Sequence, residues 1–257
     1  MHDTKDRPNV LLITPHDLGV NLGCYGPDPA IRTPHLDRLA AEGVRFERHF
    51  CTAPYCSPSR GGIFTGRHPH SNGLMGLVNL GWDLPDPSAT LPAILGGSGY
   101  KTFLFGFQHI VSDPARVGYD HVCNENGTAC TTVASDVKQF FEGRAADDRP
   151  FYAEVGFSEV HRMYRHIEEI YAAEEDVTPL PFLEDTPGLR QDLAMFYADI
   201  TVMDRAVGRI LGALEEAGLE DETLVIFTTD HGEAFPRAKA TLYDSGLRTA
   251  LLMRWPN

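Results

Sequence analysis

Short runs of apolar residues constrain the fold of this chain more than any other feature. Asn9–Thr14 and Thr223–Thr228 are apolar for most of their length, and the first run is bounded by Pro8 and Pro15. A strand without polar alternation is typical of a parallel sheet that is covered on both faces. We therefore predict a buried strand at each run. Further strands are predicted at 101–105, 151–157 and 250–254.

Helix signals separate the predicted strands. Thr33 is expected to cap a helix that has Pro34 at its first position and ends before Gly43. Other helices are predicted at 90–99, 133–141 and 189–217. Strands that alternate with helices predict an α/β fold with a mostly parallel sheet and helices on both faces. The segment between 158 and 187 is charged and lacks periodicity, so we interpret it as an irregular, substrate-facing excursion.

Polar residues with metal-binding or acid–base capacity follow three of the predicted strands. His16 and Asp17 follow the first strand, His109 follows the strand at 101–105, and Asp230 and His231 follow Thr223–Thr228. Ligands of open α/β sheets bind beyond the carboxyl ends of the strands, so these residues are expected to converge.

The two adjacent pairs, His16–Asp17 and Asp230–His231, suit a divalent cation that polarises an anionic substrate. Two imidazoles in the ligand set favour manganese, zinc or iron over calcium, which prefers oxygen. The structural alternative is a loop histidine with a hydrogen bond at position 16 and a helix cap at Asp230. We favour the cation because four such residues coincide.

The run CSPSRGGIFTG, which begins at Cys56 and ends at Gly66, carries the strongest chemical signal. Pro58 fits the first turn of a helix, so Cys56 is expected where free backbone N–H groups favour an anion. Arg60 is interpreted as a bidentate donor that matches sulfate or phosphate oxygens. This pattern predicts a hydrolase. The alternative is a structural cysteine buried before a helix.

The formal net charge of −14, without a basic run, argues against nucleic acids and anionic membranes as partners. Attraction of an anionic substrate must therefore come from basic groups in a small cleft: Arg60, Arg162, Arg165 and Lys239. The first residues, MHDTKDRPN, lack the apolar stretch of a signal peptide, and no stretch is long enough to span a membrane. We predict a cytoplasmic protein whose five cysteines are reduced. The alternative, for an exported protein, is a bridge between Cys123 and Cys130.

Motifs along the whole chain resemble those of the sulfatase family, in the alkaline phosphatase superfamily. They are PNVLLIT, TPHLDRLAAEGVRF, CSPSR, DDRPF, LRQDLAMFYADITVMDRAVGRIL and LLMRWP, and the heparan N-sulfatase (sulfamidase) branch is the most similar. The resemblance implies that 1–257 is a sulfatase catalytic domain with an alkaline-phosphatase-like fold. Family members run to roughly twice this length and end in a smaller subdomain, so a C-terminal subdomain is expected to be missing after Asn257.

The resemblance also implies how the nucleophile forms. A separate maturation enzyme, the formylglycine-generating enzyme, would oxidise Cys56 to formylglycine, whose hydrated aldehyde attacks sulfur. Pro58 and Arg60 would belong to the sequence that this enzyme recognises. The family usually carries two aspartates where this chain has His16 and Asp17. Calcium is therefore implied by resemblance, while Mn²⁺ or Zn²⁺ stay open because of the histidines.

Three further residues correspond to family positions with roles in catalysis. His109 matches the histidine that helps to collapse the sulfated intermediate, although Phe107 replaces the family lysine two residues before it. His161 matches the histidine that contacts sulfate and protonates the leaving group, and Arg162 is a possible substrate contact. Lys239 matches the basic residue that binds a sulfate oxygen.

These observations predict a sulfatase that hydrolyses a small sulfate ester or sulfamate, of a sugar or an aryl compound. Two alternatives stay open. One is a phosphodiester or phosphonate monoester hydrolase of the same superfamily, because tetrahedral oxyanions share the same donors. The other is a non-catalytic sulfoglycan-binding protein, suggested by His16, Phe107 and the short chain. The sequence predicts no oligomeric state.

Overall fold

A seven-stranded sheet forms the centre of the molecule in the computed structural model, which describes residues 7–26, 28–144, 149–169, 172 and 174–255. The strands lie in the order β2-β7-β6-β1-β5-β3-β4. The strands are β1 (Asn9–Thr14), β2 (Val44–Arg45), β3 (Lys101–Gly106), β4 (His121–Cys123), β5 (Phe151–Gly156), β6 (Thr223–Thr228) and β7 (Leu251–Arg254).

The sheet is mostly parallel, as predicted. β1 pairs in parallel with both β5 and β6, and β3 pairs in parallel with β5 and β4. β7 runs antiparallel to β6, and β2 extends that edge antiparallel to β7. The five strands expected from apolar runs are all present, with ends within one residue of the prediction. The edge strands β2 and β4 were missed because two or three residues are too few to show a pattern.

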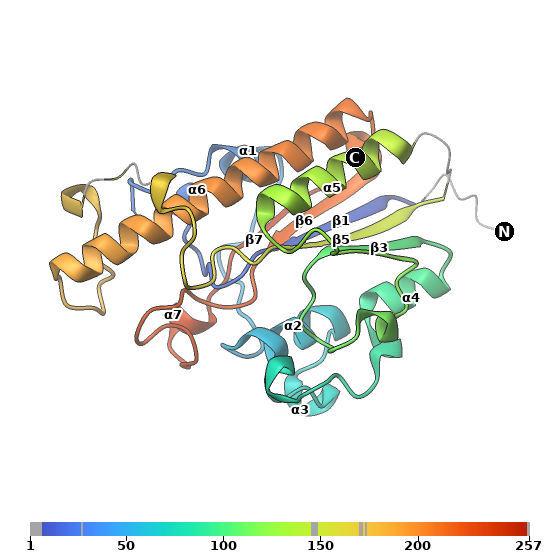
Figure 1. Ribbon diagram of the computed structural model, residues 1–257, viewed down its shortest axis with the longest axis horizontal. Coiled ribbons are helices and arrows are strands. Elements are labelled where there is room, and N and C mark those ends of the chain that lie inside the picture. The colour runs from blue at the N-terminus through green and yellow to red at the C-terminus, as the bar shows by residue number, and fades with distance from the viewer. Residues whose placement is uncertain (1–6, 27, 145–148, 170–171, 173, 256–257) are drawn as a thin grey trace.

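Helices cover both faces of the sheet, as Figure 1 shows. α1, α5 and α6 pack together on one face, whereas α2 and α4 lie on the other. The helices are α1 (Pro34–Glu42), α2 (Cys56–Thr65), α3 (Pro69–Asn72), α4 (Leu91–Gly97), α5 (Cys130–Gly143), α6 (Pro187–Glu216) and α7 (Asp244–Leu247). Short 3-10 helices are η2 (Gly23–Tyr25), η3 (Val78–Leu80), η4 (Pro87–Ala89), η5 (Pro114–Val117), η7 (Ile167–Glu169), η8 (Glu174–Asp176) and η9 (Glu220–Glu222).

Two details of the helix predictions need correction. α5 begins at Cys130, three residues before the expected start, so that the cysteine lies in its first turn. Thr33 precedes α1 but its side chain makes no capping bond, because the hydroxyl donates to Asp37 and accepts from the Gly23 N–H instead.

The core lies in two layers, one on each face of the sheet. The larger layer packs β1, β5 and β6 against α1, α5 and α6, and the smaller one lies against α2 and α4. Every residue of β5 is buried, which is expected of a central parallel strand with both faces covered. The sheet is thereby a rigid platform for the loops at its carboxyl edge.

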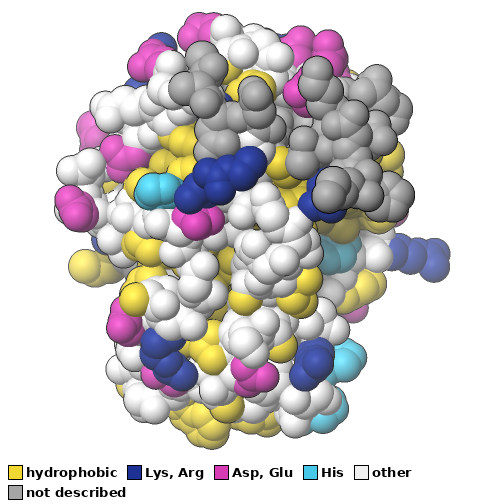
Figure 2. All heavy atoms as spheres, turned by 90° about the vertical axis from the view of Figure 1, so that its right-hand side faces the viewer, with side chains coloured by type: hydrophobic (Ala, Val, Ile, Leu, Met, Phe, Trp, Pro, Cys, Tyr) yellow, Lys and Arg dark blue, Asp and Glu magenta, His cyan; other side chains and the backbone are white. Residues whose placement is uncertain are grey.

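Charged side chains on the amino-terminal side of the sheet are dispersed. On the face shown in Figure 2, Lys and Arg side chains stand singly among acidic and apolar ones. No helix in the described part of the chain is long and apolar enough to cross a bilayer.

Candidate active site

Four loops meet at the carboxyl edge of the sheet. His16 and Asp17 follow β1, His109 follows β3, and Asp230 and His231 follow β6. His161 follows β5, and its imidazole lies with its ring centroid 5.5 Å from that of His16. The convergence predicted from strand order is therefore present, because parallel neighbours deliver their loops to one edge.

Helix α2 brings the cysteine to the same place. Cys56 is its first residue, and Ser59 Oγ donates a hydrogen bond to the Asp230 carbonyl, which fastens the first turn to the loop after β6. Gly62 permits the helix to approach the preceding loop, since a Cβ there would lie 2.1 Å from Thr52 Oγ1. The helix that begins with the cysteine is thus held against both the loop after β6 and the loop before α2.

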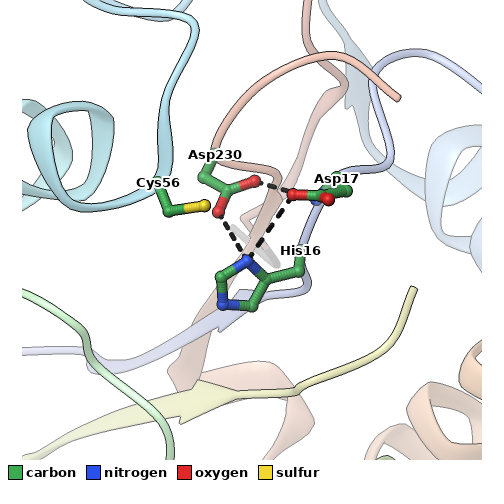
Figure 3. Close-up of side chains that lie close together, drawn as sticks. All are labelled: His16, Asp17, Cys56 and Asp230. Carbon is green, nitrogen blue, oxygen red and sulfur yellow. Dashed lines mark hydrogen bonds and ion pairs between the residues drawn. The ribbon is translucent and has the colours of Figure 1, made fainter. Parts of the chain in front are cut away.

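His16, Asp17, Cys56 and Asp230 each offer one ligand atom, and these atoms all lie within 4.8 Å of one another (Figure 3). Nδ1 of His16 is 3.0 Å from Oδ2 of Asp230, and Oδ1 of Asp230 accepts the Asp17 N–H at 3.0 Å. His231 Nε2 lies 3.2 Å from both Asp17 Oδ1 and the Cys56 sulfur. The cysteine therefore touches the predicted metal cluster directly.

The surroundings of the thiol favour a negative charge. Burial alone would raise the pKa of Cys56, but hydrogen bonds with His109, His16 and His231 outweigh it and lower the pKa to about 4. Burial opposes protonation of His231 as well, yet Asp230 and Cys56 raise its pKa to about 9. An anionic oxygen at position 56 would be stabilised by hydrogen bonds from the same histidines.

Arg60 differs from its predicted role. Its guanidinium is fully buried, with Nε donating to Asp230 Oδ2 at 3.1 Å and Nη2 donating to the Pro15 carbonyl at 2.9 Å. The prediction of a bidentate substrate donor is therefore wrong for this structure. The arginine instead neutralises and orients Asp230, because the planar guanidinium donates hydrogen bonds in fixed directions.

Lys239 also has a protein partner. Its ammonium donates to both carboxylate oxygens of Asp17, at 2.9 and 2.7 Å. It nevertheless lines the cavity over the thiol, where it can face a bound anion. Arg162 lies at the same cavity but forms an ion pair with Asp192 and donates to the Ala234 carbonyl.

Phe107 packs between the histidines. Its ring centroid lies 4.7 Å from that of His16 and 4.8 Å from that of His109, and the Arg60 guanidinium lies 5.3 Å from it. His109 has a left-handed backbone, with φ of 61°, and Asp17 has φ of 51°. Residues other than glycine rarely adopt this region of backbone conformation. Backbone strain of this kind is concentrated at functional sites.

A cavity of about 370 Å³ opens above Cys56. Of the predicted residues, His16, His109, His161 and Lys239 line it together with the thiol. The cavity is also lined by Tyr55, Leu77 and Asn79, which sequence reasoning missed, and by Ser158, the first residue of the segment expected to face the substrate. Tyr55 could have been found as the neighbour of Cys56, whereas Leu77 and Asn79 lie beside and within the short η3, which has no sequence pattern.

The residues present fit a divalent cation. Two buried carboxylates and two imidazoles converge, and the pKa of Asp230 lies well below its usual range because the positive charges of His231, His16 and Arg60 outweigh burial. Nδ1 of His16 is buried and makes no geometrically acceptable hydrogen bond within the described part of the chain. Mixed oxygen and nitrogen donors of this kind suit calcium, manganese or zinc.

Comparison with known proteins supports these observations. A model of the sulfatase family matches residues 8–257. N-sulphoglucosamine sulphohydrolase from Homo sapiens is 33% identical over 284 residues, which cover 98% of this chain and 56% of the human protein. The chain spans about half the length of the curated relatives it matches.

Solved structures share the fold. yidJ from Bacteroides fragilis superimposes with a TM-score of 0.83 at 24% identity, over all of this chain and 69% of the other. The phosphonate monoester hydrolase of Agrobacterium radiobacter superimposes with a TM-score of 0.78 at 20% identity, over 97% of this chain and 68% of the other. The sheet with helices on both faces is thus an architecture common to these proteins.

Proposed function

The chain belongs to the sulfatase family, and we propose that it hydrolyses a sulfate ester or sulfamate through a formylglycine formed from Cys56. The observation that carries this proposal is the position of the thiol. Cys56 lies at the floor of the cavity, 3.2 Å from His231 and within the cluster of His16, Asp17 and Asp230. A nucleophile at this position would meet a small anion that enters from the cavity.

His16, Asp17, Asp230 and His231 would hold the divalent cation. When bound, the cation polarises the sulfate oxygens and stabilises negative charge as a Lewis acid. Arg60 contributes indirectly, by holding Asp230 in place. Family resemblance favours calcium, and the two histidines keep Mn²⁺ and Zn²⁺ as candidates.

The chain's own residues provide the acid–base steps of the proposed mechanism. One hydroxyl of the hydrated aldehyde at position 56 loses its proton to solvent and attacks sulfur in line. The bond from sulfur to the leaving oxygen or nitrogen breaks, and His161 donates a proton to the departing alcohol or amine. His161 suits this role because it is exposed and lines the same cavity as the buried thiol. The result is a sulfate ester at position 56.

His109 would complete the cycle. It lines the same cavity as residue 56 and would accept the proton of the remaining hydroxyl. The C–O bond to sulfate then breaks, sulfate leaves, and the aldehyde forms again. The geminal diol makes this elimination possible, whereas an ester of serine or cysteine would need a second attack at sulfur.

The substrate proposed is a small sulfated sugar or aryl sulfate. Lys239 and Arg165 line the cavity with Arg162, so positive charge gathers there although the chain carries a net charge of −14. N-sulphoglucosamine, named in the human relative, is the sugar that we place first. A sulfamate differs from a sulfate ester only in the leaving group that His161 protonates.

A phosphonate monoester hydrolase is the second candidate. The shared fold and the tetrahedral shape of both anions support it. A phosphonate monoester at neutral pH carries one negative charge, as a sulfate monoester does, so charge alone does not separate them. The non-catalytic alternative requires that Cys56 stays unmodified.

The test is turnover by protein co-expressed with a formylglycine-generating enzyme. Release of sulfate from an aryl sulfate and from N-sulphoglucosamine would be measured beside hydrolysis of an aryl phosphonate ester. The proposal expects higher kcat/KM for a sulfated substrate and loss of turnover in Cys56→Ala. A preference for the phosphonate would establish the second candidate instead.

Other expectations stay predictions. They are the single catalytic domain spanning 1–257, the maturation enzyme as a partner, and the cytoplasmic location. All five cysteines are free thiols in the structure, so the maturation enzyme would find Cys56 unpaired.

A further inference from the structure

A second cluster of ligand-type side chains lies outside the active site. Cys130 from the first turn of α5, Glu159 from the loop after β5, and His166 before η7 place their sulfur, oxygen and nitrogen atoms within 4.8 Å of one another. The three residues come from separate segments of the chain. None of them lines the cavity above Cys56.

The cluster is buried and rich in negative charge. Cys130 is fully buried and Glu159 is 2% exposed. Asp199, 1% exposed on α6, lies close enough for the charge of Glu159 to raise its pKa, after the larger effect of burial. Among the described residues, the only ion-pair partner of Glu159 is His166, at 3.4 Å. Buried carboxylates usually have a stronger positive partner.

Hydrogen bonds around the cluster orient its ligand atoms toward one another. Glu159 Oε2 accepts the Cys130 N–H at 2.8 Å, which places the carboxylate beside the cysteine. Asp199 accepts the backbone N–H of His166 at 2.9 Å and so fixes the loop that presents the imidazole. His166 turns Nε2 toward Glu159, and its Nδ1 lies 3.8 Å from the exposed Glu168. A carboxylate behind a histidine is a common arrangement at zinc sites.

We propose that Cys130, Glu159 and His166 form a zinc site, with solvent at the fourth position. Thiolate, imidazole and carboxylate are the ligands that zinc takes in tetrahedral sites, whereas calcium and magnesium avoid sulfur. Binding releases the thiol proton to solvent and uses the neutral imidazole. His166 is partly exposed, with 18% of its side chain accessible, so the ion has a path from solvent.

The site would fasten the irregular segment that follows β5 to helix α5. This segment runs from Ser158 to the start of α6 with only short 3-10 turns among its described residues. Long irregular segments within compact domains are usually functional. The segment also carries His161, and the Glu159 carbonyl accepts the His16 N–H at 2.8 Å. A metal at the second cluster would therefore support the active-site loop from outside the cavity.

Cobalt titration of a Cys56→Ala protein tests the proposal. Cobalt replaces zinc, and a thiolate ligand adds a charge-transfer band in the near ultraviolet. The Cys56→Ala background removes the active-site thiol, so cobalt bound by His16, Asp17 and Asp230 produces no such band. Because the active-site cluster can also take up cobalt, the proposal expects the band to be complete within about two equivalents and to be removed by zinc.

Variants identify the ligands. In the same background, Cys130→Ala is expected to abolish the band, and His166→Ala to raise the dissociation constant at least tenfold. His166 is not fully buried, so its variant is expected to fold, as circular dichroism can verify. Cys24→Ala is the matched control, since its thiol also lies beside a carboxylate, that of Asp37, but lacks an imidazole. A folded protein without the band, or a band that survives Cys130→Ala or is unchanged by His166→Ala, would overturn the proposal.

Discussion

Nε of Arg60 donates to Oδ2 of Asp230 at 3.1 Å, and both side chains are fully inaccessible to solvent. The arginine of the CSPSR run therefore belongs to the support of the metal cluster. Burying such a charged pair costs desolvation energy. This cost is offset only by the attraction between the two charges and by their further hydrogen bonds. The pair links α2, which carries the nucleophile, to the loop after β6.

Removal of the Arg60 guanidinium should destabilise the fold strongly. Arg60→Met leaves Asp230 buried without its main permanent cation, so we expect the free energy of unfolding to fall by ~3–5 kcal/mol. Denaturant titration measures the change. Arg38→Met is the control, since the Arg38–Glu42 pair is largely exposed and should contribute less than about 1 kcal/mol. Equal losses in the two variants would contradict this role for Arg60.

His109→Ala should stop the cycle after sulfur transfer. The proposed acceptor of the second proton is lost, so kcat should fall by ~100-fold or more. Mass spectrometry after brief exposure to an aryl sulfate should detect sulfate attached to residue 56, together with a burst of released phenol. His121→Ala, which changes a histidine on the edge strand β4, should leave turnover unchanged. A slow variant that never retains sulfate would assign His109 to the first step instead.

Arg165→Ala should weaken substrate binding more than chemistry. The side chain lines the cavity at an exposed position and forms no ion pair with any described residue. Loss of one charge-assisted hydrogen bond should raise KM about tenfold while kcat changes little. Arg237→Ala is the control because Arg237 lines a separate cavity. An unchanged KM would show that the anion binds elsewhere in the cavity.

Glu154 should make stability depend on pH. It is fully buried in β5, and burial raises its pKa from a usual value of 4.5 to about 7, against the opposing bonds from Tyr119 and Tyr152. Between these two values the unfolded chain releases the proton while the folded chain keeps it. The stabilisation is complete below about 4.5 and is lost as pH rises to about 7.

Glu154→Gln removes this titration. Relative to the variant, the unmodified chain should therefore lose up to about 3 kcal/mol of stability between pH 4.5 and 7. Thermal or denaturant unfolding at several pH values measures the difference. A flat difference for Glu154→Gln would show that the pKa of its carboxyl is not raised in the folded protein.

The sequence predicted those parts of the molecule that depend on local pattern. The apolar runs at Asn9–Thr14 and Thr223–Thr228 determined the central strands. Strand direction then placed His16 and Asp230 at one edge, since parallel strands share their carboxyl ends. The helix that begins at Cys56 followed from Pro58 and the glycines after it.

Features that depend on distant partners could not be predicted. Arg60 points to Asp230, 170 residues further along the chain, and no local pattern indicates whether a guanidinium turns to protein or to solvent. The pairing of Lys239 with Asp17 could not be predicted from the sequence for the same reason. The second cluster has no local sequence signal either, because Cys130 and Glu159 are 29 residues apart in sequence.

The most direct test of the account is the mass of residue 56. Trypsin releases residues 49–60 as one peptide, since arginines precede and end it, and this peptide contains both Cys51 and Cys56. After co-expression with a formylglycine-generating enzyme, the account predicts that Cys56 is converted to an aldehyde while Cys51 keeps its thiol, as fragmentation can localise. An unmodified thiol at position 56 in active protein would contradict the central claim.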